Sequence, residues 1–413
     1  MSELRRSAER ADRRLAMSPF GVSWWTLIIW IVGVVVGARL YTSLWITDEN
    51  GLSIVSRTTP YWDFNNLWAG SRMAITGKID LLFDIPAYRA EMSSLFDRDL
   101  TFQEWSYPPS MLLLGAPLAL LPPLAAYVLW TVGGVAALHL AVSPLRLPMP
   151  YHVAAVISPP ILLSALFGQN GALITSLWIG GLGALPTRPL LAGALLGATT
   201  IKPNLAILVP IVLAVTRSWR ALSVAIATAA ALVIGSGVAF GFDAWSRFVG
   251  ETSPMMRDIL EAPFLQDHQT NAVTLFYIGR WLGMDVWAAY AVQAVTSLSA
   301  VAATIWVWRG SAPLEHRERI ALTGALVLLT TPYGYTYDMG LIAAAIVIVL
   351  ALRQRSAATP VFAVIWLFPL FNHVIAERLG ATVGGLVLLA TFAGLVATTT
   401  RTGSDPGGTA RTA

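Results

Sequence analysis

Residues 24–44 of the chain read WWTLIIWIVGVVVGARLYTSL, in which Arg39 is the single charged residue. An α-helix needs about 20 consecutive, mainly apolar residues to cross the hydrocarbon core of a membrane. Five arginines precede the run and no small-residue cleavage pattern follows it, so we interpret it as an anchor rather than a cleaved signal peptide. The sequence therefore predicts a protein whose first helix spans a membrane.

Comparable apolar runs continue almost to the C-terminus. Hydrophobic residues make up 56% of the 413 residues and charged residues 12%, and the mean hydropathy is +0.64. The runs lack the alternation of barrel strands, and lipid offers no water to unpaired backbone groups, so helices are expected. We predict an all-α integral membrane protein, a polytopic bundle of about 12 transmembrane helices. The expected spans are residues 24–44, 124–143, 151–168, 171–185, 189–201, 203–216, 219–240, 285–308, 318–333, 338–352, 358–376 and 380–398.

The placement of arginines predicts the orientation. Those in the short loops fall on the side of the basic N-terminal segment, which the positive-inside rule assigns to the cytoplasm. The segment SYPPSMLLLGAPLALLPP (106–123) is then expected not to span, because its apolar stretch is short and prolines bracket it. Two long polar segments, about 45–107 and 241–284, would lie outside with nearly all the carboxylates. We expect a cytoplasmic basic segment at 1–23, one polytopic membrane domain at 24–400 and a flexible cytoplasmic tail at 401–413.

Composition also excludes several kinds of site. The chain has no cysteine, so disulfides, thiol chemistry and cysteine metal sites are ruled out. No paired-acid motif or His–carboxylate cluster demands a metal, and we expect neither a metal nor a cofactor. No basic stripe with interleaved aromatics is present in a soluble domain, so membrane lipids and not nucleic acid are the expected surroundings.

Asp63 is the first candidate for chemistry. It lies in TTPYWDFNNLWAG (58–70), among aromatic residues of the kind that settle at a membrane–water boundary. There its carboxylate would be partly desolvated. One interpretation is that Asp63 caps a short helix, since Asp is a favoured N-cap residue. The other is that it acts on a substrate carried in lipid.

Lys202 is the second candidate. It is one of only two lysines and lies in TTIKPN (199–204), between two apolar runs. A charge at such a position costs a few kcal/mol unless it faces a cavity or a partner. Its side chain either snorkels to the lipid headgroups or binds a substrate group.

Further polar residues form two sets. Gln169 and Asn170 end an apolar run, and His268, Gln269 and Asn271 lie in DHQTNAVTLF. The side chains of Gln169 and Asn170 can bind sugar hydroxyls or form a polar helix end. Those of His268, Gln269 and Asn271 can contact a donor or acceptor, or be solvated or structural loop residues.

Tyr107 and Arg72 are weaker candidates. Tyr107 stands in SYPP, at the edge of the predicted non-spanning segment. Arg72 can bind a phosphate in bidentate fashion or balance the charge of Asp63 or Asp80.

The order of these motifs resembles a known family. DFxxxWAG (63–70), FDxxAY (83–88), YPP followed by LPP, GQN (168–170) and a Lys-Pro pair are similar to the GT87 (DUF2029) polyprenol-phosphate-mannose-dependent mannosyltransferases of the GT-C superfamily. The resemblance covers most of residues 60–350. It implies a GT-C-like bundle in a bacterial plasma membrane, with cytoplasmic termini and an active site that faces the periplasm or exterior. It also implies Asp63 as the catalytic base and Lys202 as a ligand of the donor phosphate.

The residue types agree with the implied reaction. A phosphate leaving group needs little protonation, so one carboxylate base is enough for direct displacement at the anomeric carbon. A second carboxylate is required only for retention. The expected reaction is an inverting transfer of a hexose, with mannose the expected sugar, from a polyprenyl-phosphate donor to a lipid or glycan acceptor.

One motif departs from the family pattern. At PYGYTYD (332–338) many members carry Trp-x-His-His, whereas here Tyr337 and Asp338 stand in place of the histidines. A Tyr–Asp pair can bind sugar hydroxyls but supplies no cation at neutral pH. We expect both residues to bind substrate, and the departure points to a different donor or acceptor.

Two other classes of protein are compatible with the composition. A transporter or flippase for a polar or lipid-linked substrate would place ionisable residues near the bilayer midplane on broken helices. Here the spans are poor in charge and the polar residues gather on one face, which favours catalysis at the interface. A non-catalytic envelope scaffold is the third possibility.

Overall fold

The computed structural model describes residues 24–400 apart from 98–99, 101–102, 311–312 and 354–358. The predicted N-terminal segment 1–23 and tail 401–413 lie outside the described residues. Within the described part the chain is helical, and its β-pairing is limited to the isolated bridges Thr47–Ser53 and Ala272–Tyr335. The prediction of an all-α protein is confirmed.

Among the described residues, five stretches are long and apolar enough to cross a membrane. The first, Leu27–Trp45, includes most of α2 (Trp24–Thr42). Three contain α6 (Pro123–Val142), α12 (Trp219–Phe240) and α16 (Val286–Trp308), and another joins α7 (Met149–Val156) to α8 (Pro159–Phe167). A sixth arises if α19 (Thr359–Leu367) and α20 (Asn372–Leu379), which meet at a bend of 72°, form one broken span. With these helices the chain is a membrane protein.

The remaining predicted spans coincide with shorter apolar helices. These are α9 (Gly171–Ala184), α10 (Pro189–Ala198), α11 (Leu208–Val215), α18 (Gly340–Arg353) and α21 (Gly384–Thr400). The predicted span 318–333 coincides with α17 (His316–Val327), which begins with the charged residues HRER. A helix of 14 residues, such as α9 or α18, extends only about 21 Å, which is less than the about 30 Å of a typical hydrocarbon core. The figure of about 12 spans therefore stays a prediction.

Helix α18 lies in the interior of the bundle. Its residues from Gly340 to Ala351 are all buried, and it packs against α17, α7, α21 and α9. The sequence GLIAAAIVIVLALR is apolar on every side, and such a helix is stable only when other elements surround it. Because α18 is fixed in this way, the loop that precedes it is fixed as well.

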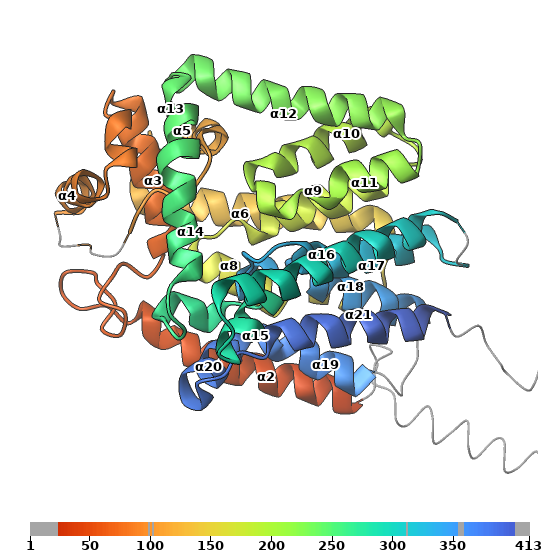
Figure 1. Cartoon of the computed structure of the whole chain (residues 1–413). Helices are drawn as coiled ribbons and strands as arrows, with labels where there is room; N and C mark the ends of the chain where they lie inside the picture. Colours follow the sequence, from red (N-terminus) through yellow and green to blue (C-terminus); the bar gives the residue numbers. More distant parts are fainter. Residues whose placement is uncertain (1–23, 98–99, 101–102, 311–312, 354–358, 401–413) are drawn as a thin grey trace, which may run out of the picture.

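The two predicted outer segments also fold into helices. The first contains α3 (Trp62–Ile75) and α4 (Ile85–Phe96), and the second contains α13 (Asp243–Arg247), α14 (Ser253–Glu261) and α15 (Leu275–Trp281). The segment predicted not to span forms α5 (Leu112–Leu118), which is too short to cross. Figure 1 shows α3, α4, α5, α13 and α14 together at one end of the bundle, with α13 and α14 running across the direction of the long helices.

The opposite end of the bundle is held by the start of α17. Each of the four residues HRER (316–319) contacts the last turn or the end of a different helix. The pairs are His316 with the Leu182 carbonyl (2.9 Å), Arg317 with the Leu145 carbonyl (3.2 Å), Glu318 with Arg353 (2.5 Å) and Arg319 with the Val307 carbonyl. The ends of α6, α9, α16 and α18 are therefore joined at one level.

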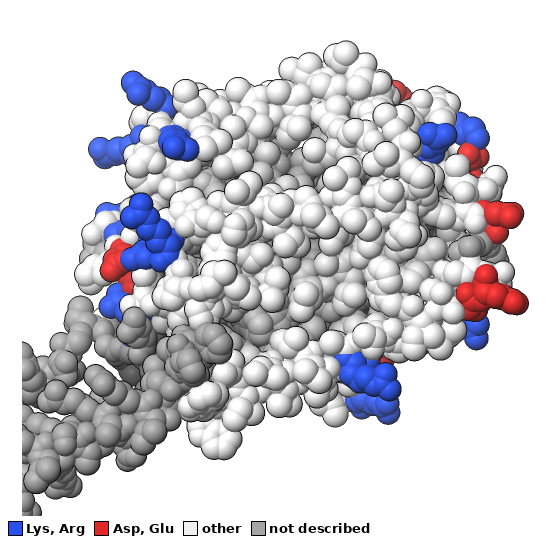
Figure 2. All heavy atoms as spheres, turned by 180° about the vertical axis from the view of Figure 1, so that it is seen from behind, with Lys and Arg blue, Asp and Glu red and all other residues white. Residues whose placement is uncertain are grey.

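Charges are separated between the two ends. In Figure 2 basic side chains gather at the left edge, and most of the visible acidic side chains lie at the right edge together with some basic ones. A broad band between the two ends carries few charges. This distribution suits a protein whose middle lies in lipid.

Candidate active site

Lys202 enters the site from a break in the chain. It separates two 3-10 turns, Thr199–Ile201 and Pro203–Leu205, which lie between α10 and α11. Its backbone is not helical, with φ −131° and ψ 77°, because a residue that precedes proline is disfavoured in the α region. Pro203 therefore interrupts the helical backbone at Lys202, and the lysine side chain points from this break into the site.

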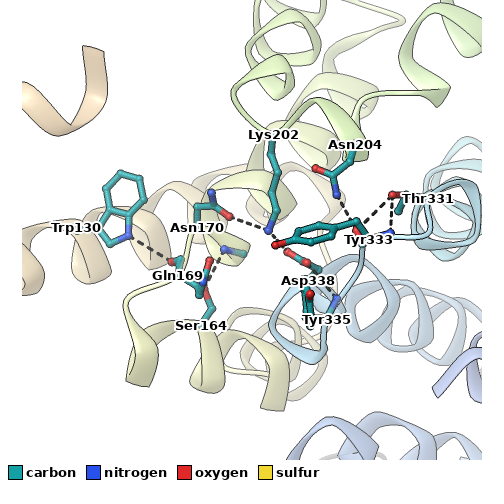
Figure 3. A network of polar contacts seen from close by, with 11 residues as sticks. Trp130, Ser164, Gln169, Asn170, Lys202, Asn204, Thr331, Tyr333, Tyr335 and Asp338 are labelled. Carbon is teal, nitrogen blue, oxygen red and sulfur yellow. Dashed lines mark hydrogen bonds and ion pairs between the residues drawn. The ribbon is translucent and has the colours of Figure 1, made fainter. Parts of the chain in front are cut away.

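The ammonium group of Lys202 forms an ion pair with Asp338. The lysine side chain is 13% exposed, and the aspartate side chain is fully buried at 0%. Lys202 Nζ also donates to Asn170 Oδ1 at 3.3 Å and lies 5.3 Å from the centre of the Tyr337 ring. Figure 3 shows the three polar side chains meeting from separate segments. A buried charge is tolerated here because it is paired and hydrogen-bonded.

Hydrogen bonds from several segments fix the loop that carries Asp338. The Tyr335 N–H donates to Asp338 Oδ2 at 3.3 Å, and Asn204 Nδ2 donates to the Tyr333 carbonyl at 2.8 Å. The second outer segment joins as well, since the Val273 N–H donates to the Gly334 carbonyl at 3.0 Å. The position of Asp338 is thus set by the fold before any substrate binds.

Two glycines allow the GQN segment to approach its neighbours. Gly168 has φ +76°, and a Cβ added there would lie 2.3 Å from the Phe64 Cβ. At Gly171 an added Cβ would lie 2.2 Å from the Tyr337 carbonyl oxygen. The start of α3 and the loop before α18 therefore pack closely on either side of Gln169 and Asn170. Side chains larger than hydrogen would push these segments apart.

Asp63 lies in the first turn of α3 and is half-buried. Tyr61 occupies the N-cap position, so the interpretation of Asp63 as the helix cap is wrong. Its carboxylate instead accepts a hydrogen bond from the Gln169 side chain. Burial raises the pKa of Asp63 from 3.8 to about 6, while Gln169 and the charge of Lys202 partly oppose that rise. The group is a stronger base than an ordinary aspartate and is still ionised at neutral pH.

Tyr107 lies near both carboxylates. It is half-buried, and its ring meets Trp105 edge-on at 5.3 Å between centroids. Burial raises the pKa of the Tyr107 phenol, and the negative charges of Asp63 and Asp338 raise it further. Its hydroxyl therefore stays protonated and can donate to an oxygen held between the two acids.

A pocket of about 420 Å³ adjoins this cluster. Its walls come from α5, α6, α8 and α9, and most of its lining side chains are apolar, among them Leu114, Leu129 and Ile161. Gln169 and Asn170 form its polar end. The Trp130 indole N–H donates to the Gly168 carbonyl at 3.1 Å and so ties the pocket wall to the GQN segment.

The three predicted site residues of the second outer segment differ in their contacts. His268 is exposed and bonds the Ile259 carbonyl at 3.2 Å. Gln269 is buried and uses its amide within its own segment, accepting from the Gln266 N–H at 2.9 Å. Of this group only Asn271 reaches the Asp338 loop, where its Oδ1 accepts from the Thr336 hydroxyl at 3.3 Å.

Arg72 belongs to the far end of α3 rather than to the cluster. Its guanidinium donates to the Ala119 carbonyl at 3.3 Å. Asp80, one of its expected partners, pairs instead with Arg247 at 3.1 Å.

Sequence reasoning missed Tyr333, Tyr335 and Asn204. The alternation YGYTYD and the asparagine of IKPN were visible as polar and aromatic residues near the predicted site. Their role depends on contacts between segments far apart in the chain, which no local pattern reports. The described residues contain no group of three or more His, Cys, Asp or Glu that could hold a metal ion.

Comparison with known proteins adds the family. The model of glycosyltransferase family 87 matches residues 105–332, which is more than half of the chain and includes Tyr107, the GQN segment and Lys202. No curated protein and no solved structure gives a significant match. The chain is a membrane glycosyltransferase and belongs to glycosyltransferase family 87.

Proposed function

We propose that the protein transfers a hexose, with mannose the expected sugar, from a polyprenyl-phosphate carrier to a lipid or glycan acceptor on the extracytoplasmic face. The observation that carries this proposal is the meeting of Asp63, Lys202 and Asp338 around Gln169 and Asn170, at the polar end of an apolar pocket. One base, one cation and an adjoining apolar volume are what a lipid-phosphate sugar donor requires.

Asp63 is the proposed general base. With a pKa of about 6 it accepts the proton of an acceptor hydroxyl as that oxygen attacks the anomeric carbon. The bond from the anomeric carbon to the phosphate oxygen breaks in the same step, and the electron pair leaves with the lipid phosphate.

Inversion is supported by the state of the second carboxylate. Asp338 pairs with Lys202 through one oxygen and accepts from the Tyr335 N–H through the other. A carboxylate engaged in this way is poorly suited to attack the sugar as a nucleophile. Retention would need such an attack, so a single displacement is the simpler reaction.

The apolar pocket suits the first isoprene units of the carrier. Its polar end at Gln169 and Asn170 lies beside Lys202, so a chain in the pocket would bring its phosphate to the lysine. The site also lies at the end of the bundle opposite the arginines of α17, which agrees with an extracytoplasmic active site by the positive-inside rule.

Transfer by purified protein in liposomes tests the proposal. Radiolabelled polyprenyl-phospho-mannose and a membrane lipid extract are supplied to the wild type, to Asp63→Asn and to Asp80→Asn. Loss of the base is expected to lower the rate about 10²–10⁴-fold. Asp80→Asn is the matched control, because that side chain is 81% exposed and pairs with Arg247 away from the cluster, and it should keep the wild-type rate.

Two results would contradict the proposal. A wild-type rate in Asp63→Asn would remove the residue as base. Absence of transfer from polyprenyl-phospho-mannose, with transfer from a nucleotide sugar, would reject the donor class.

A further inference from the structure

Lys202 has one N–H donor without a hydrogen-bond partner among the described residues. An ammonium group offers three donors. In the described residues one binds Asp338 Oδ1 and one binds Asn170 Oδ1. Because the side chain is 13% exposed, the third donor has access to the open side of the cluster. Its direction is limited by the first two bonds and by the Tyr337 ring, 5.3 Å away.

Tyr333 extends its side chain toward the same ammonium group. Figure 3 shows its phenol pointing at the Lys202–Asp338 pair, and the side chain is half-buried. Its backbone is held by Asn204 and by Thr331, whose Oγ1 accepts from the Tyr333 N–H at 3.1 Å. The ring packs edge-on against Tyr335 with centroids 5.0 Å apart. This tyrosine is therefore fixed before substrate arrives.

The Tyr333 hydroxyl also interacts with a neighbouring tyrosine. A hydrogen bond joins the hydroxyls of Tyr335 and Tyr333, and it lowers the pKa of Tyr333 while it raises that of Tyr335. The Tyr333 hydroxyl lies beside the Lys202–Asp338 pair, where a ligand of the ammonium group can also reach it.

We propose that the Tyr333 hydroxyl and the third N–H of Lys202 together bind the phosphate of the lipid-linked donor. The inference rests on the proposed function and adds a specific ligand that neither the family match nor the sequence motifs assign. The phosphate is then held by one cation and one neutral donor.

The charge of the cluster explains why a neutral donor is useful. Asp63 and Asp338 bring two negative charges against the single positive charge of Lys202, and Asp338 already shares that charge. An anionic phosphate therefore needs donors that bring no further negative charge. Burial raises the pKa of the Tyr333 phenol, so it remains a donor at every physiological pH. Hydrogen bonds to charged groups are the stronger ones in proteins.

Inhibition by polyprenyl phosphate separates the phosphate from the sugar. This molecule carries the phosphate and the lipid chain but no hexose, so it probes the proposed subsite alone. Tyr333→Phe is expected to weaken its inhibition about tenfold, which equals about 1.4 kcal/mol. The KM for the sugar donor should rise by a similar factor, with the KM for the acceptor unchanged.

Tyr290→Phe is the matched control. It removes a hydroxyl from the same aromatic cluster, but one that donates to Glu261 at 2.9 Å. It should leave inhibition unchanged. Tyr335→Phe removes the hydroxyl that interacts with the Tyr333 hydroxyl and should weaken inhibition less than Tyr333→Phe does.

Wild-type inhibition of a Tyr333→Phe enzyme that transfers mannose normally would overturn this inference and leave the proposed function standing. A rise in the acceptor KM alone would also overturn it, because Tyr333 would then bind the acceptor. If the wild type neither uses the donor nor is inhibited by polyprenyl phosphate, both proposals fail together.

Discussion

Single side chains set the protonation of the base. Gln169 lowers the pKa of Asp63 by a hydrogen bond, and its neighbour Asn170 binds Lys202. A carboxylate that accepts an amide N–H is stabilised in its charged form. The amide therefore limits how far burial raises the pKa.

Gln169→Met should shift the pH profile of transfer. Asp63 must be deprotonated to act as base, so activity is expected to fall as the pH drops through about 6, the raised pKa of this group. Removing the Gln169 hydrogen bond raises that pKa further, so the acid limb should move to higher pH. Initial rates are measured between pH 5 and pH 9 and divided by the rate on the alkaline plateau. The pH at which the rate is half of the plateau value then gives the shift.

The plateau serves as the internal control for that experiment. If Gln169 only positions substrate, its replacement would lower the plateau and leave the midpoint in place. An unchanged midpoint would therefore count against the Gln169–Asp63 hydrogen bond.

At the scale of elements, α9 begins where two other segments meet. Gly171 is its first residue, and an added Cβ would press on the Tyr337 carbonyl, a backbone atom that cannot turn aside. Gly183, near the other end of the same helix, has open space around its added Cβ. The two positions give a matched pair of Gly→Ala changes within one helix.

Gly171→Ala is expected to displace the loop that carries Asp338 and to lower transfer at least tenfold. Gly183→Ala should leave transfer unchanged and stabilise the helix by up to about 1 kcal/mol. Rates and thermal unfolding in detergent measure both effects. Equal transfer rates in the two variants would show that the loop before α18 can shift without loss of activity.

The helices themselves were largely predictable. Each apolar run expected as a span coincides with one or more helices, since apolar composition and length are local properties. The number of spans was not predictable, because α9, α17 and α18 are short. Their packing against neighbouring helices, and not their own sequences, determines their position relative to the membrane. Asp63 and Lys202 could be singled out as charges in apolar surroundings. Tyr333 could not, because its role depends on Asn204 and Asp338.

For the whole molecule, helix length determines where the site lies. The HRER segment joins the ends of α9, α16 and α18 at one level. The 23-residue α16 extends about 35 Å from that level, whereas the 14-residue α9 and α18 extend about 21 Å. The loops that carry Asn170 and Asp338 are therefore recessed by about 14 Å relative to the far end of α16. The recess explains how a paired lysine and aspartate can be buried in a chain with so few charges.

The absence of cysteine makes the orientation directly testable. Asn50→Cys lies on an exposed turn in the loop that leads from α2 into α3, and Thr187→Cys lies on the exposed loop that follows the end of α9 held by HRER. A membrane-impermeant maleimide should label Asn50→Cys in intact spheroplasts and Thr187→Cys only after permeabilisation. The wild type, which has no thiol, is the blank. The reverse pattern would place the site in the cytoplasm, where a nucleotide sugar rather than a polyprenyl-phosphate sugar becomes the natural donor. Because both variants lie on exposed loops outside the cluster, each should retain transfer activity, and the labelling then reports the orientation of working enzyme.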